Sequence, residues 1–528
     1  MELMKEKICT NLFAGKAVNQ LTLEDDFNVP DVKPDIEQIV EEIGDVKITE
    51  ARPSDGKIII RGKLDFSVLY VGANINQPMY KMTGSLPFEE SMNIDGVKPG
   101  HMIKVRWDME DLRTRVINSR KISVRSIVSL SVIAHSTKEE DAAAVQKMDS
   151  GIYTLNRDLD LSQLHIQKKD ILRVKKEIAV PASKANVMEM IWDRVMPQSM
   201  DIKVLDGKVN VRGEVGVFVM YASAEEENPL QYFSSMINFN ESAEVEGVTE
   251  EMIGHIEVRM IQWEVTAKEN EDGEVRKLDV EIVMELGMAI YEEKHMQLLE
   301  DIYANDRILE PLIKKMDFEN IMMQNQSSIK LNKIIPVERD KSKILQICQT
   351  NANIKVDRMS MNDQGINVDG VVYIQVLYIA ADDKIPVNAV KGMIPFSHTV
   401  EVPGINGKCT FEMIPVLGSV SSAMADSEEI EVRAELVFNS IVFEQIEIPV
   451  ITDVSEKPLD MEAVERMPGI IGYIVQPGDT MWNIAKRFST TADQIKKVNQ
   501  LDNEILRKGQ KLLIMREPQA VSKTAFCC

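Results

Sequence analysis

The sequence predicts a mainly β protein with small helices: three tandem antiparallel β-rich units, followed by a small module of two strands and two helices. Three observations lead to this fold class. One strand-like stretch occurs three times, with a glycine, a tyrosine and a phenylalanine at constant spacing. Short alternating apolar runs between turn signals are typical of antiparallel sheets. Residues 470–516 contain eight Lys and Arg against four Asp and Glu, whereas the whole chain has a net charge of −23.

The repeat is defined by a glycine, a tyrosine eight residues later and a phenylalanine 26 residues after the glycine. These residues are Gly62, Tyr70 and Phe88; Gly213, Tyr221 and Phe239; and Gly370, Tyr378 and Phe396. A period of roughly 150 residues suits a whole domain. A glycine inside a strand indicates a bulge or a close backbone approach, and the tyrosine is expected to pack in the core with its hydroxyl at an edge. Periodicity leaves open whether each unit is a sandwich or a curled barrel.

Composition excludes several classes of protein. With 528 residues, 44% of them hydrophobic and 27% charged, the chain is expected to fold into several globular domains. The negative net charge argues against general nucleic-acid binding, which needs a basic surface. Five scattered cysteines give no disulfide framework. The first residues lack the apolar core of a signal peptide and no apolar run reaches the ~18 residues of a membrane span, so we expect residence in a cytoplasm.

The first unit is expected over residues 1–150, including an N-terminal segment and a polar linker at Ser136–Ser150. A short helix is predicted at Asp35–Ile43, because apolar residues recur there at helical spacing and Gly44 can end it. Strands are predicted at Ala17–Leu23, Val46–Thr49, Lys57–Val71, Met79–Met82, Leu86–Asn93, Met102–Asp111 and Lys121–Ala134.

The second unit is expected over residues 151–295 and the third over 296–452, with the same order of elements. Short helices are again predicted, around residues 187–191 and 344–348. Further strands are predicted around the repeat glycines and phenylalanines and at His255–Lys268, Lys277–Tyr291, Cys409–Leu417 and Glu429–Phe443. The methionine- and leucine-rich stretch His295–Gln324 has helical spacing and predicts either a connecting helix or an interdomain packing surface.

A second linker is expected at 453–469, then the basic module at 470–516 and a tail at 517–528. Helices are predicted at Met481–Phe488 and Asp493–Val498, between strands Gly472–Gln476 and Lys511–Met515. Thr480 or Asp479 can cap the first helix, and Thr491 with Gln494 makes a capping box for the second. The core is expected to contain Trp482, Ile484, Ala485 and Phe488.

The module resembles the LysM family. The residues that match are Tyr473, the turn Pro477–Thr480, Trp482, Ile484, Ala485, Phe488, Asn499, Gly509 and Gln510. The resemblance implies a βααβ fold that binds N-acetylglucosamine polymers such as peptidoglycan, in a shallow groove between the first turn and the loop at 499–506. The implied groove residues are Gly478, Asp479, Thr480, Met481, Asn499, Asn503 and Ile505. The sequence departs from the family at Gln500 and Lys508, where prolines are usual, so the second groove wall differs.

The three larger units look like the SipL/SpoVID-type repeat of sporulating clostridia, and three such units before one LysM module resemble the SipL-type spore-coat morphogenetic family. That resemblance implies a non-enzymatic scaffold of endospore coat assembly in the mother-cell cytoplasm. The scaffold would link coat proteins to the basement-layer ATPase of SpoIVA type on the forespore surface, with the LysM domain as a protein–protein interaction module. The alternative is a cell-wall or cortex protein that binds peptidoglycan through N-acetylglucosamine.

No catalytic, cofactor-binding or metal-binding residue is predicted. The six histidines lack metal-ligand spacing, and phosphate-binding loops, HExxH and GxSxG are absent, so we expect no enzyme. Opposite charge predicts that a basic face of the module meets an acidic partner. Its candidate residues are Lys486, Arg487, Lys496, Lys497, Arg507 and Lys508. The alternatives are docking on the protein's own acidic body and a merely solvated helix face. Cys527 and Cys528 are expected to lie in a solvated tail whose thiols are available to crosslink within an assembly. The alternative is a lipid anchor, although the aliphatic prenylation motif is absent.

Overall fold

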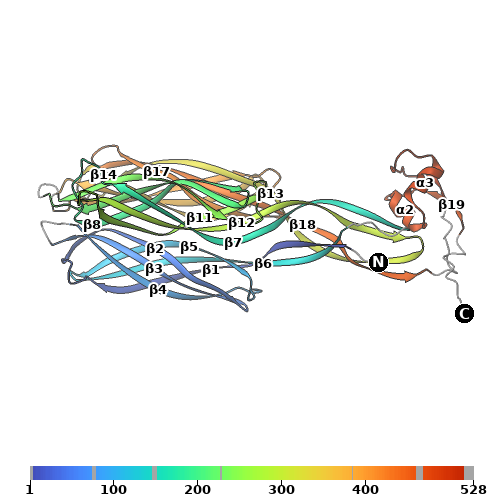
Figure 1. Ribbon diagram of the computed structural model, residues 1–528, viewed down its shortest axis with the longest axis horizontal. Helices are drawn as coiled ribbons and strands as arrows, with labels where there is room; N and C mark the ends of the chain where they lie inside the picture. Colours follow the sequence, from blue (N-terminus) through green and yellow to red (C-terminus); the bar gives the residue numbers. More distant parts are fainter. Residues whose placement is uncertain are drawn as a thin grey trace.

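The molecule is elongated, with three β-rich units at one end, a stalk of long strands, and a small helical module at the far end (Figure 1). The computed structural model describes residues 4–73, 79–144, 151–225, 229–339, 341–382, 384–459 and 468–515. Cys527, Cys528 and part of each predicted linker lie outside these residues. Among the described residues, no helix is both long and apolar enough to cross a membrane.

Each unit contains six strands in the same order. Unit 1 comprises β1 (Met4–Asn28), β2 (Ile36–Ser54), β3 (Lys57–Gly72), β4 (Met79–Asn93), β5 (Met102–Asn118) and β6 (Lys121–Ala144). Unit 2 comprises β7 (Ile152–Ala179), β8 (Glu189–Leu205), β9 (Lys208–Ala222), β10 (Leu230–Glu244), β11 (Ile253–Glu269) and β12 (Val275–Ala304). Unit 3 comprises β13 (Arg307–Pro336), β14 (Ile344–Asn362), β15 (Gly365–Ala380), β16 (Val387–Glu401), β17 (Cys409–Met424) and β18 (Glu429–Pro458).

Every unit is a sandwich of two three-stranded antiparallel sheets. In unit 1, β2, β3 and β4 form one sheet, with β3 in the centre, and β1, β6 and β5 form the other, with β6 in the centre. Units 2 and 3 repeat this topology. The edges of the two sheets come together where β2 meets β5 and β4 meets β1. The antiparallel fold class is therefore confirmed, and the arrangement is a sandwich with closely approaching edges.

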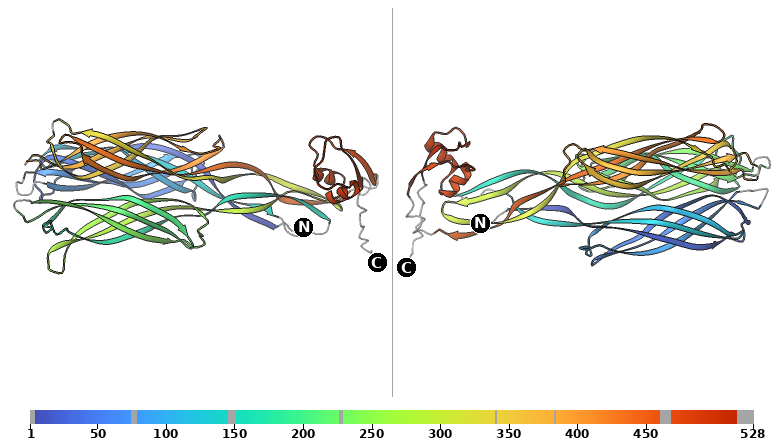
Figure 2. Two further views of the ribbon diagram at one scale, coloured as in Figure 1. Left: turned by 90° about the horizontal axis from the view of Figure 1, so that it is seen from above. Right: turned by 180° about the vertical axis from the view of Figure 1, so that it is seen from behind.

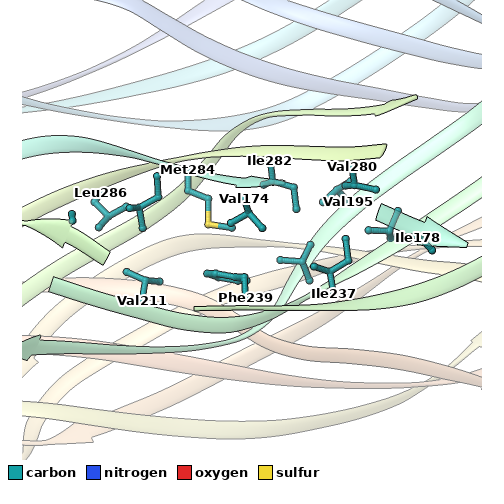
Figure 3. Packing of buried hydrophobic residues seen from close by; sticks show 14 of the residues in the cluster. Val174, Ile178, Val195, Val211, Ile237, Phe239, Val280, Ile282, Met284 and Leu286 are labelled. Carbon is teal, nitrogen blue, oxygen red and sulfur yellow. The ribbon is translucent and has the colours of Figure 1, made fainter. Parts of the chain in front are cut away.

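The core of each unit lies between its two sheets. In unit 2, Val211 and Phe239 from one sheet face Val174 and Ile282 from the other (Figure 3). Successive side chains of a strand point to opposite faces of the sheet. Every second residue is therefore buried between the two sheets, and the residues between them face the outside of the unit.

The repeat glycine provides space for the repeat phenylalanine on the neighbouring strand. Gly62 is paired in register with Phe88. A Cβ atom on Gly62 would lie 2.6 Å from the Lys47 carbonyl oxygen and 2.6 Å from the Phe88 ring. The same two kinds of contact recur at Gly213 and Gly370. The prediction of a close backbone approach is confirmed, and the three glycines occupy equivalent positions.

The repeat tyrosine fixes the segment that enters each unit. All three tyrosines are fully buried. Each hydroxyl donates a hydrogen bond to the backbone carbonyl 36 residues earlier: Tyr70 to Pro34 (3.3 Å), Tyr221 to Ala185 (2.8 Å) and Tyr378 to Ser342 (3.1 Å). A buried hydroxyl needs a hydrogen-bond partner. Each tyrosine therefore packs its ring in the core and holds the backbone of the entry segment with its hydroxyl.

The short helices predicted at the start of each unit are wrong, since those segments lead into or form β2, β8 and β14. In β2, the pairing with β3 shifts between Ile36 and Gln38 and again between Ile39 and Glu41. Each bulge adds one residue and moves the alternation by one place. Apolar residues therefore recur three or four positions apart, as in a helix, although the backbone is extended.

The predicted linker at Ser136–Ser150 and the predicted connecting helix at His295–Gln324 are strand over their described residues. Residues 136–144 continue β6. Residues 295–324 belong to β12 and β13, apart from the short turn between these strands. Of the second predicted linker, residues 453–458 belong to β18. The ends of these strands build the stalk.

The stalk consists of three two-stranded ribbons, β1–β6, β7–β12 and β13–β18, that extend from the three units and twist together (Figure 2). Apolar residues from all three ribbons form its core. They include Ile8, Ala142, Leu161, Met296, Leu298, Met316, Phe318, Ile448 and Val450. Because each ribbon alone would leave this face exposed to water, the ribbons stabilise one another.

The three units also meet face to face at the wide end of the molecule. The outer faces of the sheets that contain β3, β9 and β15 bury one shared apolar cluster. Its fully buried members are Val40, Leu69, Val71, Met79, Ile191, Trp192, Phe218, Met220, Ala222, Leu377, Val387 and Ala389. The second half of each central strand is accordingly buried on both faces.

Candidate partner-binding site

The C-terminal module has the predicted order of elements. Strands β19 (Ile470–Ile474) and β20 (Lys511–Met515) pair antiparallel, and helices α2 (Met481–Arg487) and α3 (Ala492–Asn499) lie between them in the chain. Thr480 caps α2 by accepting a hydrogen bond from the Asn483 backbone amide at 3.1 Å. Thr491 caps α3 by accepting one from the Gln494 amide at 3.0 Å.

The first groove wall is built around Asp479. One oxygen of its carboxylate accepts hydrogen bonds from the Gln476 amide and the Tyr473 hydroxyl, both at 2.7 Å. These two bonds lower the pKa of Asp479. The preceding Gly478 has a φ of 90°, a conformation that other residues rarely adopt. Asp479 therefore shapes this turn, which the LysM resemblance predicts as the first groove wall.

Two of the predicted groove residues have structural positions. Met481 is only 2% exposed and belongs to the module's core, so its predicted place as a groove contact is wrong. The Asn499 side chain donates to the carbonyls of Ile495 and Leu513 and accepts from the Leu513 amide, which fixes the second wall to β20.

Of the predicted groove residues, Gly478, Thr480, Asn503 and Ile505 are exposed. Ile505 is 77% exposed at the tip of the loop that follows α3, and its amide bonds the Asn503 side chain at 3.0 Å. An apolar side chain held out by a fixed loop is a natural first contact for a partner.

The basic face is smaller than its six candidates suggest. Lys496 pairs within the module with Asp493 at 2.9 Å and Glu504 at 3.0 Å. Arg487 lies over the rings of Tyr473 and Phe488. The remaining exposed candidates are Lys497, Arg507 and Lys508, because Lys486 is engaged elsewhere.

Lys486 joins the module to the stalk. Asp301, near the end of β12, accepts hydrogen bonds from Lys486 Nζ at 2.6 Å and Trp482 Nε1 at 2.8 Å. Burial by itself raises the pKa of Asp301, but these hydrogen bonds outweigh it and hold the pKa below its usual value. The Tyr303 hydroxyl donates to the Thr490 carbonyl at 2.8 Å. The module is therefore attached by charge-assisted and neutral hydrogen bonds.

Trp482 lies at this junction rather than in the centre of the module's core. Its ring meets Tyr303 edge to face, with centroids 4.8 Å apart, and Tyr303 stacks on Tyr153 from β7. The prediction of a core tryptophan is thus corrected to a half-buried residue that the stalk helps to cover. One alternative for the basic face was docking on the protein's own acidic body. The structure shows this for Lys486, which pairs with Asp301 of the stalk. Gly478, Thr480, Asn503 and Ile505 stay exposed in the docked module, so docking leaves these predicted groove residues accessible.

Replacing Asp301 by alanine is expected to release the module from the stalk while both remain folded. Hydrogen bonds to charged groups contribute about 1.5–3 kcal/mol each when buried, and less here because the site is partly exposed. Small-angle scattering should show a longer mean dimension and protease should cut between β18 and β19 faster. Asp306→Ala is the matched control and should change neither measurement, because Asp306 is an exposed neighbour whose one ion pair among the described residues is with Arg307 at 3.6 Å. Identical scattering for both variants would show that Asp301 does not hold the module.

Two sites were missed by sequence reasoning, and both lie where the units meet. One is a cavity beside Arg194. The other is a charged cluster in which Lys104 of unit 1 pairs with Glu412 of unit 3 at 2.7 Å, beside His255 of unit 2. The apolar runs in β3, β9 and β15 were the available signal, because continuous rather than alternating apolar residues indicate burial on both faces. No group of three or more potential metal ligands is assembled among the described residues.

Fold and site together define a β-repeat protein with a small accessory module on a stalk. The family model of the SipL SPOCS domain matches three times, at residues 35–117, 186–268 and 343–425, and the model of the LysM domain matches residues 473–514. The chain is therefore a protein of SipL-type architecture, with three SPOCS domains followed by one LysM domain. Each SPOCS match covers four strands, β2–β5 and their counterparts, whereas the structure shows that the sandwich needs the flanking β1 and β6 as well.

Curated relatives match only a short stretch. The chain is 45% identical over 51 residues to a probable endopeptidase p60 of Listeria monocytogenes, which is 10% of each chain. It is 49% identical over 41 residues, 8% of each chain, to a probable endopeptidase p60 of Listeria grayi. The chain thus spans about a tenth of the length of these relatives. The endopeptidase activity in their names is said of those proteins and not of this chain. No solved structure matches the chain.

Proposed function

We propose that this protein is a non-enzymatic scaffold of endospore coat assembly, acting in the mother-cell cytoplasm at the forespore surface. Its domains come from a sporulation-related family and a peptidoglycan-binding-type family, both of them non-catalytic modules. The observation that supports a scaffold most directly is the LysM module at the tip of a long stalk, with the predicted groove residues Asn503 and Ile505 exposed. In this proposal the groove binds the basement-layer ATPase of SpoIVA type, and the three SPOCS units bind other coat proteins.

The stalk suits this role because it separates two binding regions by a fixed distance. Strands β12 and β13 each contain 30 residues. At about 3.3 Å per residue each strand would span at most roughly 100 Å, and the stalk is the part of this length that lies beyond the sandwiches. The contacts of Asp301 with Trp482 and Lys486 hold the module in one orientation on the stalk. Binding a partner then costs less conformational entropy than it would for a module on a free linker.

The second candidate is binding of peptidoglycan through N-acetylglucosamine. It is supported by the LysM match itself, a peptidoglycan-binding-type module. The turn at Gly478 and Asp479 keeps the geometry of a groove wall, while Gln500 and Lys508 replace the prolines expected in the other wall. A protein partner is proposed first because Ile505, an exposed apolar residue, lies on that second wall.

Replacing Ile505 by aspartate is expected to weaken capture of the ATPase about tenfold, because the change puts a charge where apolar surface is buried. The measurement is pull-down of the purified ATPase and, separately, of purified peptidoglycan by the full chain. Ile470→Asp is the matched control, since Ile470 is also an exposed isoleucine of the module, 60% exposed on β19. A combined Lys497→Glu, Arg507→Glu and Lys508→Glu variant tests the basic face at low and high salt.

The two candidates give opposite patterns. The scaffold is supported if the full chain captures the ATPase and not peptidoglycan, and if this capture is lost in Ile505→Asp and kept in Ile470→Asp. If the full chain captures peptidoglycan and not the ATPase, the glycan-binding function replaces the scaffold function. Unchanged capture of the ATPase by both groove and basic-face variants would move recognition to the SPOCS units.

A further inference from the structure

The hairpins β5–β6 of unit 1 and β11–β12 of unit 2 form tips at the end of the molecule away from the stalk (Figure 1). Strand β6 begins at Lys121 and reaches the stalk core at Ala142, and β12 begins at Val275 and reaches the same core at Met296. Both turns therefore point away from the LysM module. Because the two hairpins occupy equivalent places in two repeats, their side chains can be compared directly.

The unit 1 tip combines arginine with exposed apolar side chains. Arg113 is 79% exposed and pairs with Asp111 at 2.8 Å, whereas the exposed Arg115 forms no ion pair with any described residue. Next to them, Val116 is 40% and Ile117 49% exposed. Both face solvent because Ile117 is the extra residue of a bulge in the pairing with β6. Positive charge and apolar surface thus lie side by side.

A third apolar side chain extends this surface. Arg120, beside the tip, donates hydrogen bonds to the carbonyls of Val29 at 3.1 Å and Pro30 at 3.0 Å, which holds the turn after β1 against the hairpin. Val32 on that turn is 91% exposed. Single exposed apolar residues are ordinary on a protein surface, whereas neighbouring ones beside arginines have the composition of a protein interface.

The unit 2 tip has the opposite charge. Four exposed acids of this hairpin form no ion pair with any described residue: Glu269, Glu271, Asp272 and Glu274. The nearby Lys268 is already paired with Asp279. In the equivalent hairpin of unit 3, Glu428 is neutralised by Lys343 at 3.0 Å. Unit 2 therefore presents unpaired negative charge of the kind that the unit 1 tip attracts.

We propose that the wide end is a self-association surface, on which the unit 1 tip of one copy docks on the unit 2 tip of a second copy. The net charge of −23 makes two copies repel one another over most of their surface, so a basic tip facing an acidic one is favoured. Among the described residues, no hydrogen bond or ion pair joins the two tips within one chain, and both remain open to a second copy.

The contact closes on itself. Both tips lie at the same end of the chain, so a two-fold axis makes the contact twice, with each copy supplying both sides. The two stalks then point in opposite directions, and one LysM module lies at each end of the dimer. This contact is independent of the LysM groove residues.

The test is sedimentation velocity of the full chain at concentrations up to about 0.1 mM, where contacts of micromolar affinity are occupied. The unaltered chain is expected to form a dimer whose dissociation constant rises with salt, because salt screens exposed charges. Arg113→Glu combined with Arg115→Glu is expected to raise that constant about tenfold or more, since both contacts then oppose like charges. Glu271→Lys combined with Asp272→Lys should do the same from the other side.

Mixing these two double variants separates a contact between copies from a loss of folding. Each variant alone has two tips of like charge, whereas a mixed pair has opposite charges at both contacts, so the mixture should dimerise. Arg52→Glu combined with Lys57→Glu is the matched control and should dimerise as the unaltered chain does. These exposed residues lie on the β2–β3 hairpin at the other end of unit 1, and the change in charge is the same. Ile117→Ser should weaken the dimer without changing its salt dependence.

A monomeric unaltered chain would overturn the proposal, and so would a mixture that stays monomeric. Loss of the dimer in the Glu271 and Asp272 variant alone would mean that the acidic tip meets another basic surface, which also overturns it. If the chain is monomeric and its arginine tip instead retains it on phosphatidylglycerol vesicles, the tip is a membrane contact and self-association is rejected. Circular dichroism of each variant shows that it is folded.

Discussion

Replacing Gly370 by alanine is expected to lower the free energy of unfolding of the third SPOCS unit by about 3 kcal/mol or more, an overpacking effect at the upper end of its usual range. The added Cβ would lie 2.2 Å from the Lys355 carbonyl oxygen and 2.8 Å from the Phe396 ring. The ring could rotate away, but the carbonyl belongs to the paired strand β14 and could move only by distorting the sheet. The measurement is denaturant unfolding of the full chain, followed by circular dichroism.

The matched control is Gly287→Ala, at a strand position of β12 where an added Cβ meets nothing within 4 Å. That variant should keep or slightly raise the stability, because alanine restricts the unfolded chain more than glycine does. Equal effects of the two substitutions would mean that the repeat glycine is not required for close approach. Gly62→Ala and Gly213→Ala should behave like Gly370→Ala.

His255 is expected to make the chain about 3 kcal/mol less stable at pH 4 than at pH 6.5, relative to a variant without this histidine, at roughly 1.4 kcal/mol per pKa unit. His255 is 6% exposed, and burial lowers its pKa from 6.5 to about 4. The unfolded chain binds a proton at His255 as the pH falls through 6.5, whereas the folded chain does so only near 4. Stability from the neutral histidine is thus complete above pH 6.5 and lost towards pH 4.

Protonation of Glu412 also destabilises the folded chain, but at lower pH than protonation of His255. Burial by itself raises its pKa, but Lys104 outweighs burial and lowers it to about 2. Its contribution is therefore present above pH 4.5 and lost between 4.5 and 2. Arg106 and Glu257 are the other charges that face His255. The test is thermal unfolding of the unaltered chain and of a His255→Asn variant, measured against pH. Burial raises the pKa values of Glu41 and Asp45, and these acids stabilise both proteins as the pH falls. The stability of the unaltered chain relative to the variant should therefore fall by about 3 kcal/mol between pH 6.5 and 4.

Glu412→Gln gives the companion result at neutral pH. It should cost about 2 kcal/mol, because Lys104 would keep its charge in a partly buried place without its partner. Glu447→Gln is the control, since Glu447 pairs with Lys315 at 2.6 Å on an exposed surface where such pairs contribute little. A difference in stability between the unaltered chain and His255→Asn that does not change with pH, or equal costs for Glu412→Gln and Glu447→Gln, would contradict a role of this cluster in holding the units together.

The repeat residues show how far local sequence determines structure. Gly62 and Phe88 are 26 residues apart and meet in one hairpin, so their constant spacing predicts a constant contact. The LysM module was predictable to within one or two residues for the same reason. Its caps at Thr480 and Thr491 and the turn at Gly478 are local devices that act within a few residues.

The errors arose where one local pattern has two physical origins. Apolar residues at Ile36, Ile39 and Val40 fit a helix, and they equally fit a strand with bulges after Ile36 and Ile39. Only pairing with β3 decides between them, because a bulge is defined by the partner strand. The same ambiguity explains why the connecting helix, one of two predictions for residues 295–324, is instead a pair of long strands. The other prediction, an interdomain packing surface, agrees with the apolar side chains that these strands place in the stalk core.

The sequence by itself determined the three β-rich units, their glycine–tyrosine–phenylalanine frame and the LysM module, because each depends on contacts within one unit. Tertiary structure alone decided the stalk, the packing of the units around a shared apolar cluster and the Asp301 junction. Asp301 and Lys486 are 185 residues apart in the chain. Such pairs leave no periodic trace in the sequence, because periodicity records which face of an element is buried and never which distant surface covers it.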